Sequence, residues 1–344
     1  MAAAADDAVP ADAPSHQAFV HYRRPAVRDL AWLVFDGALQ LPHGSGAPAT
    51  VVLDAAERAE LLALLHQWDD DAEDGWLGPV DPNLRLGLYT ERLLGAWLAH
   101  AGTIRLLAQN WPLRSSRITI GEADFLVQRR SSNAENPRGA RQGGLQLWEL
   151  ACKFYLGVPG RGWIGPGLND SLAAKLARMR SHQLQLIHQP GFSAAWQGDW
   201  SALAWLAGWL LAPVADQAAA PAGRIPGVWA EAAGASLACA QARAAALEVE
   251  QWWLLPKRRW LRPMHGDAPV AQAFEGLRDA AAFIAGPSAP RQRGTGFARP
   301  LMLAGMRGPD RSGIATEVLR LMLVPQGWSQ RAAALPDARQ RTTS

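Results

Sequence analysis

The spacing of apolar residues changes once, after about the first third of the chain. Before that point they recur every three to four positions, which is the period of an amphipathic helix. One helix is predicted from about Ala26 to Phe35, and a second follows Asp54, whose side chain can cap it while Glu57 completes a capping box. A long helix is predicted from Leu84 to about Gln109. Because this segment is apolar nearly all round, we expect it to be largely buried.

After Pro112 the period becomes two, which is typical of strands. The segments RITIGEADFLV (117–127) and LQLWELACKFYLG (145–157) are predicted to be neighbouring strands of one sheet. A capped helix is expected to begin near residues 169–171, and the Trp-rich segment 196–212 is expected to be helical. Further on, strand-like runs alternate with Ala-rich helical patches.

These elements predict an α/β fold with a mixed central sheet flanked by helices. The expected organisation is a disordered leader (1–20), a helical N-terminal addition (21–83), an α/β core (84–230), a mixed, strand-containing C-terminal region (231–328) and a disordered tail (329–344).

Composition excludes several classes of protein. The chain has 344 residues, of which 49% are hydrophobic and 19% charged, so it is too apolar to be disordered as a whole. No apolar run reaches the roughly 18 to 20 residues of a membrane span, and the first twenty residues lack the pattern of a secretory signal. We therefore expect a soluble, cytoplasmic protein with no membrane partner. Its two cysteines cannot build a disulfide framework or a four-thiolate zinc site.

The charge balance alone does not indicate a partner. Lysine and arginine total 34 against 31 acidic residues, which gives a net charge of +3. Only three of the basic residues are lysines, namely Lys153, Lys175 and Lys257. In a chain that otherwise uses arginine, each lysine points to a local need for a compact ammonium group.

The two predicted strands carry the candidate chemistry. Residues two apart share a face of a strand, so Glu122 and Asp124 point the same way, as do Glu149 and Lys153 on the next strand. Carboxylates such as Asp124 and Glu149 are the ligands that Mg²⁺ prefers, together with water and phosphate oxygens. A neighbouring lysine can orient or deprotonate a water molecule, or neutralise phosphate charge. Either strand taken alone also fits the solvated side of a half-buried sheet.

Two helices add further candidates. Glu91 is the only charge on a face of the long helix that also carries Leu88 and Leu98. A carboxylate on an apolar face needs a partner, which can be a metal-bound water, a lysine or a structural arginine. On the later helix Lys175, Arg178 and His182 form a basic stripe, which in isolation also fits a solvated face.

Two basic segments are candidates for contact with nucleic acid. The loop 128–144 between the two strands contains Arg129, Arg130, Arg138 and Arg141, which are expected to contact a phosphodiester backbone. The alternative is a solvated, disordered insertion. Further on, the segment 252–262 interleaves tryptophans with basic residues, which suits stacking on unpaired bases or, equally, burial in the second part of the sheet. Neither a phosphate loop nor a nucleophile elbow occurs in the sequence.

Several runs resemble the bacterial family known as domain of unknown function 1853. They are Val27–Trp32, Leu88–Glu91, Gly121–Leu126, Trp148–Gly157, Lys175–His182 and Val324–Trp328, and the resemblance covers residues 20 to 328. That family is similar in turn to the PD-(D/E)XK nuclease superfamily, which implies a restriction-endonuclease-like core over 84–230. The resemblance also implies that Asp124 and Glu149 bind a magnesium or manganese ion, with Glu91 as the acidic residue of the helix.

The chain departs from the nuclease pattern at one position. The pattern has lysine two residues after the glutamate, but Ala151 stands there and Lys153 follows two residues later, about 13 Å instead of about 7 Å along the strand. Lys153 is the first candidate for the catalytic lysine, and Lys175 from the following helix is the second. The main hypothesis is a metal-dependent nuclease. The alternative is an inactive nuclease fold that binds nucleic acid or protein.

Overall fold

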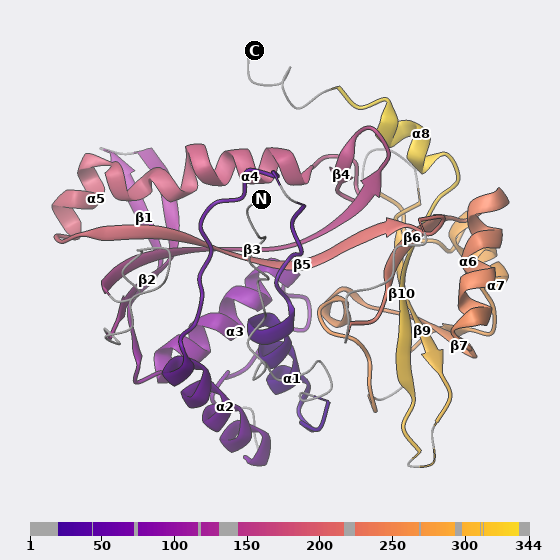
Figure 1. Ribbon diagram of the computed structural model, residues 1–344, viewed down its shortest axis with the longest axis horizontal. Coiled ribbons are helices and arrows are strands. Elements are labelled where there is room, and N and C mark those ends of the chain that lie inside the picture. The colour runs from indigo at the N-terminus through magenta and orange to yellow at the C-terminus, as the bar shows by residue number, and fades with distance from the viewer. Residues whose placement is uncertain are drawn as a thin grey trace, which may run out of the picture.

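The computed structural model of the protein has a large mixed sheet at its centre (Figure 1). It describes residues 20–42, 44–71, 75–115, 118–130, 144–216, 224–267, 270–292, 298–309, 311 and 313–336. Across these residues ten strands form the sheet, in the order β1-β2-β3-β5-β6-β10-β9-β7-β8, with β4 paired to β3. The strands are β1 (Ile104–Ser115), β2 (Ile118–Arg129), β3 (Gly144–Val158), β4 (Gly162–Ile164), β5 (Trp200–Pro213), β6 (Gly227–Glu231), β7 (Gln251–Leu254), β8 (Ala273–Phe274), β9 (Leu301–Arg307) and β10 (Thr316–Val324).

Helices flank this sheet, so the predicted α/β fold with a mixed central sheet is confirmed. The helices are α1 (Pro25–Ala31), η2 (Trp32–Asp36), α2 (Ala55–Asp70), α3 (Leu86–His100), α4 (Leu172–Ser181), η3 (Gln183–His188), α5 (Pro190–Ala195), α6 (Gly234–Ala246), η4 (Lys257–Trp260), α7 (Leu277–Ala285) and α8 (Trp328–Ala333). In Figure 1, α1, α2 and α3 lie below the first half of the sheet, and α4 and α5 lie above it. Within the described ranges, no helix combines the length and apolar character that crossing a membrane requires.

Strand directions divide the sheet into blocks. β1, β2 and β3 are antiparallel, and β3 then pairs with β5 in parallel. β5, β6 and β10 are also parallel to one another, whereas β10, β9, β7 and β8 are antiparallel. Because β6 pairs with both β5 and β10, the sheet continues across the expected boundary between residues 230 and 231.

Local signals in the sequence account for the helix starts. The Asp54 side chain accepts a hydrogen bond from the Glu57 N–H, and the Glu57 side chain accepts one from the Asp54 N–H, each at 2.9 Å. The predicted capping box is therefore confirmed. The side chain of Ser171 caps α4 by accepting from the Ala174 N–H at 3.2 Å, which confirms the predicted start of that helix.

Two predicted helices were wrong in extent or type. The helix expected over 84–109 ends at His100, and β1 begins at Ile104. The Glu60 carboxylate fixes the turn between them by accepting hydrogen bonds from the N–H groups of Gly102 and Thr103. The segment expected to be helical over 196–212 forms β5 instead. This strand lies inside the sheet with both faces largely covered, so its apolar residues run on without the alternation that marks a half-exposed strand.

The C-terminal half has a core on each face of the sheet. On one face, α6 and α7 pack on β6, β9 and β10, around residues such as Ala240 and Leu321. The other core includes Trp229 and Trp328.

The disordered tail expected from residue 329 is wrong for its first part, because α8 extends to Ala333 and the Ser329 hydroxyl donates to Glu231 at 2.7 Å. The leader expected over 1–20 lies outside the described residues except for its last position.

Candidate active site

The predicted strand pair separates at the position of the candidate carboxylates. β2 and β3 pair from Arg129 and Gly144 as far as Phe125 and Trp148, and no further. The next residue of β2 is Asp124, whose Oδ2 accepts a hydrogen bond of 2.8 Å from the Leu150 N–H of β3. Where the backbone pairing of β2 and β3 ends, the Asp124 carboxylate thus accepts the hydrogen bond that a backbone carbonyl accepts elsewhere in the sheet. We call this point the strand fork.

Glu149 is the first residue of β3 beyond the pairing, and its side chain is buried. The residue is 2% exposed, and its Oε1 accepts a hydrogen bond from Gln183 Nε2 of η3. Its Oε2 is buried and has no hydrogen-bond partner among the residues that the structure describes. Since a buried carboxylate oxygen without a partner is costly, this atom marks a place where a cation or a donor belongs.

Lys175 reaches the same place from α4. Its Nζ donates to Gln183 Oε1 at 2.9 Å, so a single amide links the ammonium group to Glu149. The helix is held above the sheet by Leu176 and Met179, which pack on Ala151 of β3. The small side chain at position 151 therefore lies beneath α4, next to the charged group that the helix supplies.

Lys153, the first candidate for the catalytic lysine, has another partner. Its Nζ lies 2.9 Å from Asp170 Oδ2, and the Tyr155 hydroxyl donates to the same oxygen at 3.3 Å. Lys153 still adds to the positive potential at Lys175, whose pKa it lowers. It therefore lies beside the fork, but its ion pair is with Asp170 and not with Asp124 or Glu149.

Glu91 approaches the fork from α3, which packs on the other face of the sheet. Its side chain is half-buried, while Leu88, one turn earlier on the same helix, is 41% exposed. One turn later, Gly95 lies so close to Gln109 of β1 that an added Cβ would fall 2.5 Å from the amide oxygen. The absence of a side chain at position 95 lets α3 lie against β1. Among the described residues no arginine or lysine pairs with Glu91, so the alternative of a structural arginine partner is not seen.

Burial and mutual repulsion raise the pKa values of the three carboxylates. Burial, followed by the charges of Asp124 and Glu91, raises the pKa of Glu149 to about 8, although Lys175 and Gln183 oppose this. Burial and the charges of Asp124 and Glu122 raise the pKa of Glu91 to about 7. Burial raises the pKa of Asp124 to about 6, although the Leu150 hydrogen bond and Lys175 lower it. Near neutral pH the site therefore holds protons that a cation can replace.

The basic partner is perturbed in the opposite direction. Burial and the charge of Lys153 lower the pKa of Lys175, whereas Glu149, Asp124 and Asp170 raise it. A lysine with a lowered pKa is more readily deprotonated than a free lysine. Lys175 therefore combines the position and the chemistry expected of a general base or of a phosphate-neutralising group.

The donor set at the fork fits a magnesium-like ion with a substrate, not a preassembled protein cage. Over the ranges that the structure describes, no three His, Cys, Asp or Glu side chains form a group that could hold a metal. Magnesium is usually held by one or two carboxylates, with water and phosphate oxygens completing the shell. The unpartnered Glu149 Oε2, together with Asp124, matches that smaller requirement.

The candidate nucleic-acid residues have different surroundings. Arg129 is 4% exposed and forms an ion pair with Glu57, so its assignment to a phosphate-binding surface is corrected. It also donates to the Val52 carbonyl oxygen at 3.0 Å, which fixes α2 and its leading segment against β2. Arg130, Arg178 and His182 are exposed. Arg138 and Arg141 lie outside the described residues.

Gln183 and Asp170 belong to the site but were not predicted from the sequence. Gln183 follows the end of α4 and belongs to a 3-10 helix, so the periodicity of α4 does not extend to it. Asp170 precedes the cap of α4 and is close to Lys153 only because β3 and α4 lie side by side. The signal that could have found both is that Asp170 and Gln183 are polar residues flanking the helix that carries Lys175.

Comparison with known proteins identifies the family. The family model described as domain of unknown function (DUF1853) matches residues 28–324, and the chain belongs to this family. The family predicted from the sequence runs is therefore confirmed. No curated protein and no solved structure matches the chain.

Proposed function

We propose that the protein is a metal-dependent phosphodiesterase that cleaves nucleic acid, with a restriction-endonuclease-like core of the PD-(D/E)XK type. One observation carries the proposal. At the strand fork, the chain brings Asp124, Glu149 and Lys175 together on two strands and a helix, with one Glu149 oxygen buried and unpartnered among the described residues. Two carboxylates and a lysine are groups that suit metal-assisted hydrolysis of a phosphodiester.

In this proposal Asp124 and Glu149 hold magnesium or manganese, and Glu91 adds negative charge from α3. When bound, such an ion supplies charge neutralisation at the phosphate and a water molecule of lowered pKa. Two hydrogen bonds orient the carboxylates that would bind this ion. The Leu150 N–H orients Asp124, and the Gln183 amide orients Glu149. Glu149 then loses its proton on loading near neutral pH, since its pKa is raised to about 8 in the absence of the ion.

Lys175 acts on the attacking water or the phosphate in this proposal. Gln183 Oε1 accepts a hydrogen bond from Nζ and so limits the directions in which the ammonium group points. Burial lowers the pKa of Lys175, which increases the fraction of neutral amine that can accept a proton from water. Lys153 is 39% exposed at the side chain and, with Asp170, lies where it can contact an adjacent phosphate.

The exposed basic residues Arg130, Arg178 and His182 would bind the substrate backbone, with Arg138 and Arg141 of the loop. Contacts of this kind give affinity without sequence preference. Replacing Arg130, Arg138 and Arg141 with glutamine should reduce binding similarly for all sequences. The slope of log affinity against log salt should become shallower by about 0.9 for each duplex phosphate that the variant no longer neutralises. An unchanged slope in the folded variant would favour a solvated insertion.

The direct test is cleavage of labelled duplex, single-stranded and branched DNA and of RNA, each with magnesium or manganese. We expect cleavage by the wild-type protein and its loss in Asp124→Asn and Glu149→Gln. A matched control is Glu248→Gln, since Glu248 is an exposed carboxylate whose side chain is 75% accessible and pairs with Arg307 of β9. The proposal is wrong if no substrate is cut faster by the wild type than by Glu149→Gln.

A second candidate is an inactive fold that binds nucleic acid or protein. It is favoured by Ala151 at the usual lysine position and by the pairing of Lys153 with Asp170. Calorimetric titration with manganese separates the two, because a binding-only fold needs no ion. Manganese binding that disappears in Asp124→Asn supports the enzyme, and its absence in the wild type supports the second candidate.

A further inference from the structure

A cavity lies on the opposite side of α3 from the strand fork. It has a volume of about 690 Å³ and is lined by α1, by the segment 75–80, by α3 and by residues 258–267. Tyr89 of α3 lines it. Because Tyr89 and Glu91 are two positions apart on a helix, they project about 200° from each other. The cavity is therefore separate from the candidate active site.

The floor of this cavity is a charge-balanced network. Asp29 Oδ2 accepts a hydrogen bond of 2.9 Å from the Tyr89 hydroxyl, and Asp29 Oδ1 lies 3.0 Å from Arg262 Nε. Arg262 Nη2 lies 2.7 Å from Asp267 Oδ1, and Arg28 Nη1 lies 3.5 Å from the same oxygen. Two arginines thus compensate two aspartates in a nearly dry environment, so these four groups neutralise one another.

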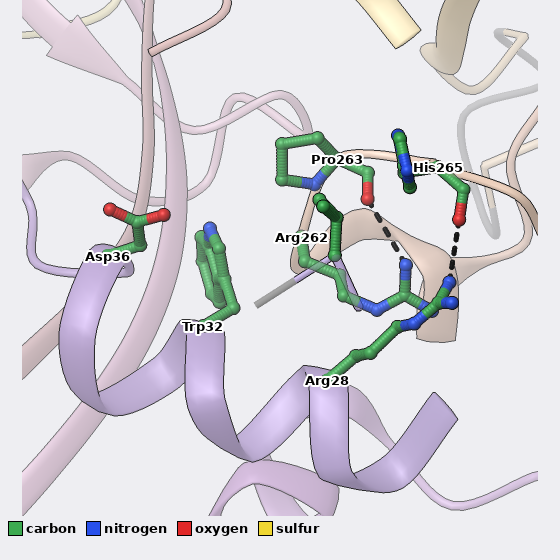
Figure 2. Close-up of a pocket in the computed structure, with 7 residues that line it drawn as sticks. Arg28, Trp32, Asp36, Arg262, Pro263 and His265 are labelled. Atoms are coloured by element: carbon green, nitrogen blue, oxygen red, sulfur yellow. Dashed lines mark hydrogen bonds between the residues drawn. The ribbon is translucent and has the colours of Figure 1, made fainter. Parts of the chain in front are cut away.

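Backbone contacts fix the same two arginines. Figure 2 shows Arg28 and Arg262 lying side by side at the edge of a smaller neighbouring pocket. There Arg28 donates to the His265 carbonyl oxygen at 2.6 Å, and Arg262 donates to the Pro263 carbonyl oxygen at 3.1 Å. These contacts join α1 to the segment that follows β7, so the floor connects the two halves of the chain.

Arg258 of η4 adds a positive charge that this floor does not compensate. Arg258 and Arg259 both line the cavity. The Arg258 guanidinium lies 4.6 Å from the centre of the Tyr89 ring, which holds it over the cavity side of α3. Within the described part of the chain, no carboxylate lies at ion-pair distance from Arg258. The cavity therefore presents a guanidinium group toward its contents.

The remaining lining is mostly apolar. It consists of Pro25, Ala26, Leu77, Pro79, Val80 and Met264, with Gly75 and Gly78. A mostly apolar cavity with a few convergent polar groups is typical of small-molecule sites, whose volumes run from about 300 to about 1,000 Å³. An inorganic ion would leave most of this space and all of its apolar surface unused.

We propose that this cavity binds a small phosphate ester with an apolar body, of about the size of a mononucleotide. Arg258 binds the phosphate, because a planar guanidinium donates two parallel hydrogen bonds to its oxygens. The apolar segment 77–80 and Met264 enclose the body of the ligand. The ligand bridges α1, α3 and η4 and so stabilises the contact between the two halves. This inference does not depend on the nuclease proposal.

The experiment is calorimetric titration of the full chain with adenosine 5′-monophosphate, ribose 5-phosphate, adenosine and inorganic phosphate, without divalent ions. We expect adenosine 5′-monophosphate to bind at least about tenfold more tightly than adenosine or inorganic phosphate, and to raise the melting temperature. A short 5′-phosphorylated single strand distinguishes a free nucleotide from the end of a nucleic acid. Equal or absent binding of all four small molecules would overturn the proposal.

Variants locate the binding. The variant Arg258→Gln should weaken binding by about tenfold or more, whereas the exposed control Arg299→Gln should leave it unchanged. Asp124→Asn should also bind like the wild type, because the fork lies on the other side of α3. Loss of binding in Asp124→Asn with full binding in Arg258→Gln would assign the ligand to the fork and contradict the inference. Circular dichroism of each variant verifies that it is folded.

Discussion

Asp124 Oδ2 accepts a hydrogen bond of 2.8 Å from the backbone N–H of Leu150 on the neighbouring strand. The bond lies immediately beyond the last backbone pair of β2 and β3, so it secures a carboxylate where the two strands part. Within the described part of the chain, only this oxygen of Asp124 accepts a hydrogen bond, so the other can face a ligand. A residue of the candidate site thereby also secures the strand fork.

The raised pKa values predict how stability depends on pH. Glu149, Glu91 and Asp124 have pKa values of about 8, about 7 and about 6, all above the ordinary values of these groups. Their contribution to stability is fully present below the pKa values of the unfolded chain and is lost as pH rises through the folded values. In chelator, the melting temperature should therefore fall between about pH 5 and about pH 9.

Glu149→Gln isolates this effect, because glutamine does not titrate. The melting temperature of Glu149→Gln should increase relative to that of the wild type as pH rises. Manganese should reduce the difference at high pH, because the ion takes the place of the dissociated protons. A difference that stays constant across the range would show that Glu149 is ionised throughout.

The two lysines should differ in their effect on cleavage. Lys175→Met removes the ammonium group that is linked through Gln183 to Glu149, and we expect it to abolish most activity. Lys153→Met breaks the pair with Asp170 and should cause a smaller decrease, chiefly in substrate affinity. Steady-state rates at saturating and limiting substrate separate the two effects. The reverse order would return the catalytic role to Lys153.

Gln183 should act as a positioning residue. Gln183→Leu leaves Glu149 Oε1 without its donor and Lys175 Nζ without its acceptor, while keeping a side chain of similar size. We expect a decrease of about 1 to 3 kcal/mol in unfolding free energy, measured by urea denaturation. Manganese affinity should also fall, which a purely structural role would not cause. Gln185→Leu, two residues later and exposed, is the matched control.

Arg129 should behave as a structural residue. Arg129 and Glu57 are both almost fully buried, so Arg129→Ala leaves an uncompensated carboxylate and should cost about 3 to 5 kcal/mol. Arg130→Ala changes an exposed neighbour and should cost less than about 0.5 kcal/mol. Urea denaturation of both variants measures the contrast, and equal destabilisation would refute the buried-pair explanation. A loop variant that included Arg129 would therefore not keep the fold intact.

The sequence predicts the structure correctly where one local pattern determines it. Alternation predicts β2 and β3 as neighbours, and the pair of Asp54 and Glu57 predicts the start of α2. Alternation is absent from β5, which is covered on both faces, and from the first part of β1, which follows a buried helix. The sequence therefore predicts helix over most of β5 and over β1 as far as Gln109. Which lysine lies closer to Glu149 also depends on how α4 crosses the sheet, and spacing along β3 does not contain that information.

The contact between Arg28 and the His265 carbonyl joins positions 237 residues apart, and β6 reaches its partner β10 only after much intervening chain. On the ribosome, the first helices therefore emerge long before the segment that completes their surroundings. In the nascent chain, the edge of β6 that pairs with β10 and one side of α1 remain exposed until β10 has been synthesised. We therefore expect the nascent chain to need chaperones. Refolding from denaturant should be slow, and its yield should rise as the protein is diluted.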